Sequence, residues 1–167
     1  ISASGNKNSF SLINLKKISY SLEQEQRKYK ILLCGGDTVF SNKLSFTIIS
    51  IGFTKKIIFR NKANLYDDIY VTGNLGDSFT GLQIMKNKLK IKGRLKNYFI
   101  NKYFHPSLPF KIVKKLKTFA NTSIDISDGL IADLNKLINK QKLSYSLELN
   151  KIPISSNLQK FINENRI

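Results

Sequence analysis

A few aspartates in a lysine-rich chain indicate where chemistry takes place. Asp37 follows a pair of glycines, and Asp125 and Asp128 stand on either side of Ser127. Carboxylates without cysteine or histidine partners are hard oxygen ligands that suit Mg²⁺, which usually takes one or two protein carboxylates together with substrate phosphates and water. These residues therefore indicate magnesium-assisted phosphate chemistry.

The first of these contexts is the sequence Gly35-Gly36-Asp37-Thr38, which follows a predicted strand at 31–33. Paired glycines let the backbone approach a ligand closely, and a carboxylate beside them can hold a cation. Glycine and aspartate are also the commonest turn residues. Taken alone, the motif favours a strand-to-turn corner over a ligand site.

A second glycine-rich stretch, 71–78, runs from a predicted strand through a turn into a predicted helix. Such a helix start can present backbone N–H groups to an anion. The stretch lacks the lysine of a P-loop and the spacing of a dinucleotide-binding fingerprint, so it is a weak phosphate motif. Asp77 or Ser78 can equally serve as the N-cap of the helix.

The third context, 123–130, combines a predicted strand end with the start of a helix that continues through Asp133 and Leu134. Strand alternation places Asp125 and Ser127 on one face. Helix capping needs either Ser127 or Asp128 and gives no reason for Asp125. A ligand site and a plain helix start both remain open for this segment.

Nucleophilic catalysis by a Ser, Cys or His side chain has little support in the sequence. His105 is the only histidine and precedes a proline in a predicted turn, so a Ser-His-Asp or Cys-His arrangement is disfavoured. Cys34 is the only cysteine; it cannot form an internal disulfide, and we expect it to be a small core residue. This cysteine usage predicts a reducing, cytoplasmic setting.

The composition predicts a folded protein with a strongly basic surface. The 167 residues are 41% apolar and carry 28 Lys+Arg against 11 Asp+Glu, a net charge of +17. The charge comes almost entirely from lysines spread along a chain rich in Ile and Asn, which indicates codon drift and predicts no nucleic-acid or membrane partner. A basic nucleic-acid-binding module is the alternative from another class, and it would require the lysines to share one face.

The apolar pattern predicts a mixed α/β chain. Strands are predicted near 10–15, 30–34, 44–51, 57–59, 69–72 and 145–149. Helical spacing is found over 79–89, 110–120, 130–138 and from residue 158. The polar stretch 60–64 marks the predicted boundary between a unit at 1–59 and a unit at 60–167.

Taken in order, the motifs at 35–38, 70–78 and 123–130 resemble those of bacterial thiamine-monophosphate kinases, and the resemblance extends over nearly the whole chain. It implies a two-lobed synthetase-like fold, with 1–59 as the latter part of an amino-terminal ATP-binding lobe and 60–167 as the first part of a carboxyl-terminal lobe. It also implies ATP- and Mg²⁺-dependent phosphorylation of thiamine monophosphate to thiamine diphosphate by direct in-line transfer. A homodimer formed through the amino-terminal sheets is implied as well.

The resemblance assigns roles to six residues, and Ser127 and Asp128 would form the catalytic pair. By motif, ATP would be bound by Gly36, Asp37, Arg60 and Ser127, and Mg²⁺ by Asp37, Asp125 and Asp128.

This sequence also departs from the family pattern at several positions. Phe40 stands where the family often has an arginine. Residues other than the family's usual Gly, Lys, Pro and Gly occupy the segment after Arg60, at Lys62, Asn64, Leu65 and Tyr66.

Two further acidic motifs of the family are absent from this sequence and are expected upstream of Ile1 and downstream of Ile167. We therefore expect an internal piece of the enzyme that is inactive by itself. The alternatives within the superfamily are ligases of the aminoimidazole ribonucleotide synthetase type and selenophosphate synthetase.

Overall fold

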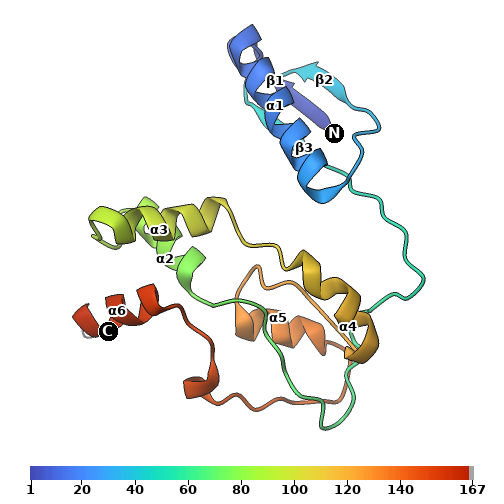
Figure 1. Ribbon diagram of the computed structural model, residues 1–167, viewed down its shortest axis with the longest axis vertical. Helices are drawn as coiled ribbons and strands as arrows, with labels where there is room; N and C mark the ends of the chain where they lie inside the picture. The colour runs from blue at the N-terminus through green and yellow to red at the C-terminus, as the bar shows by residue number, and fades with distance from the viewer. Residues whose placement is uncertain (166–167) are drawn as a thin grey trace. The chain divides into compact units, whose positions relative to one another are not determined.

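In the computed structural model, which describes residues 1–165, the chain divides into two compact units at 1–54 and 55–167. The sequence predicts the division after residue 59, a few residues later along the chain. Figure 1 shows the elements of both units, and each unit is described by itself below.

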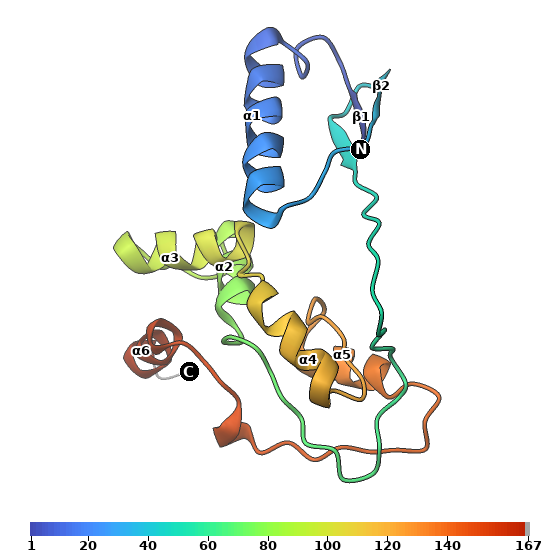
Figure 2. The ribbon, with the colours of Figure 1, turned by 45° about the vertical axis from the view of Figure 1, so that its right-hand side comes forward.

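The first unit is a three-stranded sheet with one helix. Its central strand β1 (Ser2–Gly5) pairs in parallel with β2 (Asp37–Phe40) and antiparallel with β3 (Ser45–Thr47), giving the order β2-β1-β3. The parallel pair is connected by α1 (Leu12–Tyr29), which lies along one face of the sheet (Figure 2). Parallel strands need such a crossover, so β1, α1 and β2 form a βαβ unit.

The strand predicted at 10–15 is wrong, because α1 begins at Leu12. Ser11 is the N-cap, and its side chain accepts a hydrogen bond from the backbone N–H of Asn14 at 3.4 Å. Leu15, Ile18 and Leu22 recur at helical spacing and line the hollow between the helix and the sheet. The short apolar run fits a strand only when it is considered without the residues that follow it.

The second unit has its hydrophobic core between three helices, α2 (Asp77–Met85), α3 (Gly93–Phe104) and α6 (Ser156–Asn165). The buried side chains of this core are Ile84, Phe99, Leu158 and Phe161. A Cβ atom on Gly81 would lie 2.2 Å from the carbonyl oxygen of Phe99, so α2 and α3 approach each other closely through this glycine.

The remaining elements of the second unit are short. They are η1 (Phe110–Ile112), α4 (Val113–Phe119), α5 (Leu130–Leu137) and η2 (Leu149–Lys151). Helices therefore occur in all four regions where helical spacing predicts them, although α2 ends at Met85, before the predicted Leu89. The helix α3 was not predicted from the sequence.

Most of the predicted strands are absent from the described residues. The segments 30–34, 57–59, 69–72, 123–126 and 145–149 have no strand pairing, and the strand predicted at 44–51 is limited to β3. Cys34 is exposed, so the prediction that it belongs to the core is wrong. An apolar run becomes a strand only when a neighbouring backbone supplies a ladder of hydrogen bonds, and these segments have no such neighbour within the chain described. None of the helices described has the length and apolar character needed to span a membrane.

Candidate active site

The loop that precedes α5 is held by a buried carboxylate. The backbone N–H groups of Ser127, Asp128 and Gly129 all donate to Oδ2 of Asp133, at 2.9, 2.9 and 3.1 Å. Asp133 lies in the first part of α5 and is only 2% exposed. The loop conformation is therefore set by a side chain reaching back from the helix.

This geometry removes the capping interpretation of the motif. The N-cap of α5 is Gly129, with φ 120° and ψ 156°, and it makes no side-chain cap bond. That backbone conformation favours glycine, which explains the residue at this position. Because neither Ser127 nor Asp128 caps the helix, helix formation does not account for their side chains.

A lysine joins the exposed and the buried carboxylates. Lys136 donates from Nζ to Oδ1 of Asp133 at 2.9 Å and also to Oδ2 of Asp128. The hydrogen bond from Lys136, followed by those from the three backbone amides, lowers the pKa of Asp133 to about 2. The same contacts, with that of Asp128 the largest, raise the pKa of Lys136. Asp133 and Lys136 are therefore both charged at neutral pH.

Asp125 and Arg60 lie close together although they are far apart in the sequence. Nη2 of Arg60 is 3.6 Å from Oδ1 of Asp125, and both side chains are mostly exposed. An exposed ion pair of this length contributes little to stability, about 0–1 kcal/mol. Its importance is that it brings together two of the residues predicted to bind the nucleotide and the metal ion.

Hydrogen bonds fix the segment around Arg60 against the loop that carries Asp125. Thr122 donates from its hydroxyl to the carbonyl of Phe59 at 2.7 Å. Gln141 makes two bonds with the backbone of Ala63, at 2.9 and 3.2 Å. These hydrogen bonds within the second unit therefore hold the backbone on either side of Arg60 in place.

Gly36 and Asp37 belong to the first unit. A Cβ atom on Gly36 would lie 2.2 Å from the carbonyl oxygen of Ile1, so this glycine is required by the pairing of β2 with β1. The exposed carboxylate of Asp37 accepts a hydrogen bond from the N–H of Thr38 at 2.7 Å. Whether Asp37 shares a cleft with Asp125 and Asp128 stays a prediction.

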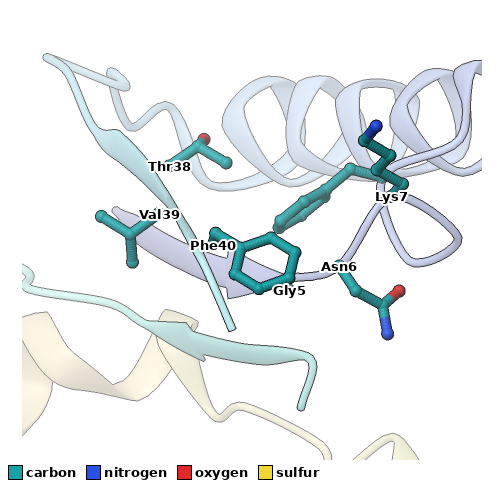
Figure 3. A pocket seen from close by; sticks show the side chains of 7 residues that line it. Gly5, Asn6, Lys7, Thr38, Val39 and Phe40 are labelled. Atoms are coloured by element: carbon teal, nitrogen blue, oxygen red, sulfur yellow. The ribbon is translucent and has the colours of Figure 1, made fainter. Parts of the chain in front are cut away.

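Two hollows lie in the first unit. One, of about 690 Å³, lies between α1 and the sheet and includes Gly36 and Asp37 in its wall. The other, of about 440 Å³, is formed by the loop after β1 and by β2; Figure 3 shows Asn6 and Lys7 on the loop and Phe40 on the strand. Phe40, where the family often has an arginine, thus gives the second hollow an apolar wall.

The carboxylates fit Mg²⁺ by their chemistry and exposure. Asp128 is 65% exposed and Asp125 is 74% exposed, so their hard oxygen atoms can be reached by an ion. Within residues 1–165, no three Asp, Glu, His or Cys side chains gather into a group that could hold a metal ion by themselves. Substrate phosphates would therefore have to complete the coordination.

Sequence reasoning missed Asp133 and Lys136 as site residues. A signal for Asp133 does exist, because it occupies a position on the apolar face of α5 together with Leu130, Leu134 and Leu137. A charged residue at such a position is almost never fully buried unless it is paired. The lysine that pairs with it gives no such signal, because lysines occur throughout the chain.

Comparison with solved structures shows which known fold the chain shares. The chain resembles two solved structures with a TM-score of 0.82 and 24% identity, over 98% of its length: thiamine monophosphate kinase from Aquifex aeolicus, and a structure described as AaThiL complexed with AMPPCP and TMP. It covers 56% and 52% of those chains, respectively. The chain therefore has a mixed α/β fold, as the sequence predicts, and shares it with these two structures.

Sequence comparison then identifies the relatives, although no protein-family model matches the chain. The chain is 43% identical over 144 residues to the thiamine-monophosphate kinase of Buchnera aphidicola from Acyrthosiphon pisum, covering 84% of this chain and 44% of the relative. It is 36% identical to that of Leptospira interrogans (86% and 48%) and 34% identical to that of Escherichia coli K12 (89% and 46%). The chain is therefore a relative of the thiamine-monophosphate kinases, and it spans about half the length of the relatives it matches.

Proposed function

We propose that the protein containing this chain transfers the γ-phosphoryl group of ATP to thiamine monophosphate, giving thiamine diphosphate. The observation that carries the proposal is the similarity to enzymes named thiamine-monophosphate kinase over 84–89% of the chain. The solved relative bound to AMPPCP and TMP supports ATP and thiamine monophosphate as the two substrates, since AMPPCP is an ATP analogue.

In this proposal the chain's own residues position the phosphates. Arg60 binds the nucleotide through its planar guanidinium, and the hydroxyl of Ser127 donates to an ATP phosphate. Asp125 and Asp128 hold Mg²⁺ from the second unit, and Gly36 and Asp37 contribute nucleotide and metal contacts from the first. Mg²⁺ bound there would neutralise charge on the phosphates.

The transfer needs no covalent intermediate with the protein. A terminal oxygen of thiamine monophosphate attacks the γ-phosphorus in line, the bond from that phosphorus to the β,γ-bridging oxygen breaks, and ADP leaves. The protein then catalyses the transfer by positioning the two substrates and by stabilising the negative charge of the transition state. The site can therefore catalyse phosphoryl transfer although no Ser, Cys or His side chain serves as a nucleophile.

Further parts of the proposal concern the whole protein. We assign 1–59 to an ATP-binding lobe and 60–167 to a second lobe, and we propose a cytoplasmic homodimer. Both edges of the small sheet, β2 and β3, have exposed apolar side chains such as Phe40 and Phe46, which supports association through this unit. Because the chain spans less than half of each curated relative, we expect the 167 residues alone to be inactive.

The proposed function is tested with the protein at its full encoded length, ATP and Mg²⁺. Thiamine diphosphate and ADP should form in equal amounts from thiamine monophosphate, and chelation of Mg²⁺ should abolish both. Turnover of an aminoimidazole ribonucleotide precursor or of selenide instead would favour one of the other superfamily activities. Tight, steeply salt-dependent binding of nucleic acid without turnover would favour the basic module.

A further inference from the structure

The start of α5 looks like a phosphate-binding site but is already filled by the protein itself. The N-terminus of a helix offers unpaired backbone N–H groups, which commonly bind a phosphate. Here the N–H groups of Ser127, Asp128 and Gly129 converge on Oδ2 of Asp133. These three donors are therefore not available to a substrate phosphate.

The side chains of the loop lie on the outside of it. Ser127 and Asp128 are exposed, whereas Asp133 beneath them is buried. The loop thus has a backbone fixed from the inside and polar side chains on the outside. Such an arrangement restricts where the Ser127 hydroxyl and the Asp128 carboxylate can lie.

Lys136 extends this control to the side chain of Asp128. It bridges the buried carboxylate of Asp133 and the exposed carboxylate of Asp128. Asp133 therefore acts on the loop in two ways, through the backbone amides directly and through Lys136.

We propose that Asp133 is a positioning residue for phosphoryl transfer, which presents Ser127 and Asp128 to the nucleotide and its metal ion by occupying the anion site at the start of α5. The inference rests on the proposed function and deepens it, because it adds two residues, Asp133 and Lys136, to the machinery of the same site. A misplacement of about 1 Å at a reacting group can cost about a hundredfold in rate, so a positioning residue has a measurable effect.

The competing explanation is that Asp133 only stabilises the second unit. Asp77 provides a matched control, because it is also a buried aspartate at the start of a helix. Its carboxylate accepts hydrogen bonds from the hydroxyls of Tyr98 and Ser155, both at 2.7 Å, and it connects α2 to α3 and to the residue that precedes α6. A purely structural role for Asp133 predicts the same consequences as replacement of Asp77.

The test compares Asp133→Asn with Asp77→Asn in the protein at its full encoded length. In Asp133→Asn, an amide N–H₂ group must face either the three backbone donors or the ammonium group of Lys136, and both arrangements place donor against donor. The hydroxyls of Tyr98 and Ser155 can rotate to accept from an asparagine, so the control should adapt. Two quantities are measured: hydrogen exchange of the amides of 127–129, and kcat and KM for thiamine monophosphate below the melting temperature.

We expect exchange at 127–129 to become at least about tenfold faster in Asp133→Asn and kcat to fall about a hundredfold, with both quantities near wild type in Asp77→Asn. Unchanged exchange would overturn the claim that Asp133 holds the loop. Faster exchange with kcat equal to that of the control would overturn the positioning role.

Failure of the proposed function gives a different pattern. If the wild-type protein does not phosphorylate thiamine monophosphate, that function is wrong and the catalytic role of Asp133 falls with it, while exchange still decides whether Asp133 holds the loop. If Asp133→Asn does not fold, Lys136→Met replaces it. That variant should keep the amides protected and lower kcat about tenfold, and an unchanged kcat would overturn the proposal.

Discussion

At the scale of the residue, the acidic side chains of the candidate site divide into two kinds. Asp125 and Asp128 are exposed and have cations as neighbours, whereas Asp133 is buried and accepts backbone hydrogen bonds. Exposed carboxylates can exchange a lysine or arginine for a metal ion at little cost to stability. The buried carboxylate instead maintains the loop on which one of them stands.

Replacement of Asp128 separates catalysis from folding. Asp128→Asn should lower kcat about a hundredfold, equivalent to about 2.7 kcal/mol, because under the proposed function it removes a negative charge that would hold Mg²⁺ at the transferring phosphate. Stability should change by less than about 1 kcal/mol, since the side chain is exposed and its ion pair with Lys136 lies at the surface. Turnover at saturating Mg²⁺ and thermal unfolding are measured on the same sample. Turnover near that of the wild type would remove Asp128 from the catalytic site.

Arg60 offers a test of nucleotide binding. Arg60→Lys keeps the positive charge beside Asp125 but loses the planar fork that matches a phosphate, so KM for ATP should rise about tenfold. Arg94 is exposed on α3 and provides the control, because Arg94→Lys makes the same chemical change outside the site. Equal KM values for the two variants would show that Arg60 does not contact the nucleotide.

At the scale of the element, the sequence predicts helices better than strands. The spacing of Leu130, Leu134 and Leu137 is a local property of one segment, and α5 forms where that spacing predicts it. The strand predicted at 69–72 depends on a partner backbone; within residues 1–165 the only pairing nearby is an isolated bridge between Leu75 and Ile154. A strand's partner cannot be identified from its own residues.

The residues of the candidate site differ in the same way, and for a similar reason, in how far a local pattern points to them. Asp125 and Asp128 could be identified because serine and glycine beside acidic residues form a local pattern. The interactions made by Asp133 could not, because they depend on the loop folding back onto α5. The pairing of Arg60 with Asp125 likewise requires a contact between distant parts of the chain.

The packing of α2 against α3 gives a prediction for stability. Gly81→Ala should destabilise the second unit by about 1–3 kcal/mol, because the new methyl group would meet the carbonyl oxygen of Phe99 and the helices would have to separate. Gly52 has no atoms within 4 Å of an added Cβ, so Gly52→Ala should remain within about 1 kcal/mol of the wild type. Chemical denaturation followed by circular dichroism measures both. An unchanged midpoint for Gly81→Ala would contradict the close helix contact.

At the scale of the whole molecule, the proposed function assigns site residues to both units. Gly36 and Asp37 lie in the first unit, and Arg60, Asp125, Ser127 and Asp128 lie in the second. The acidic residues are few in a chain with a net charge of +17, so a cleft that gathers them would differ sharply from the basic surface around it. The prediction to test is therefore a single nucleotide and metal site with residues from both units.

The most direct test is a crystal structure of the protein at its full encoded length with Mg²⁺ and a non-hydrolysable ATP analogue. We predict that Asp37, Asp125 and Asp128 face one cleft and reach the same nucleotide–metal cluster, with carboxylate oxygens about 2.1 Å from the ions they bind or one water molecule away. A nucleotide bound elsewhere, with Asp37 and Asp128 on opposite surfaces, would contradict the shared site.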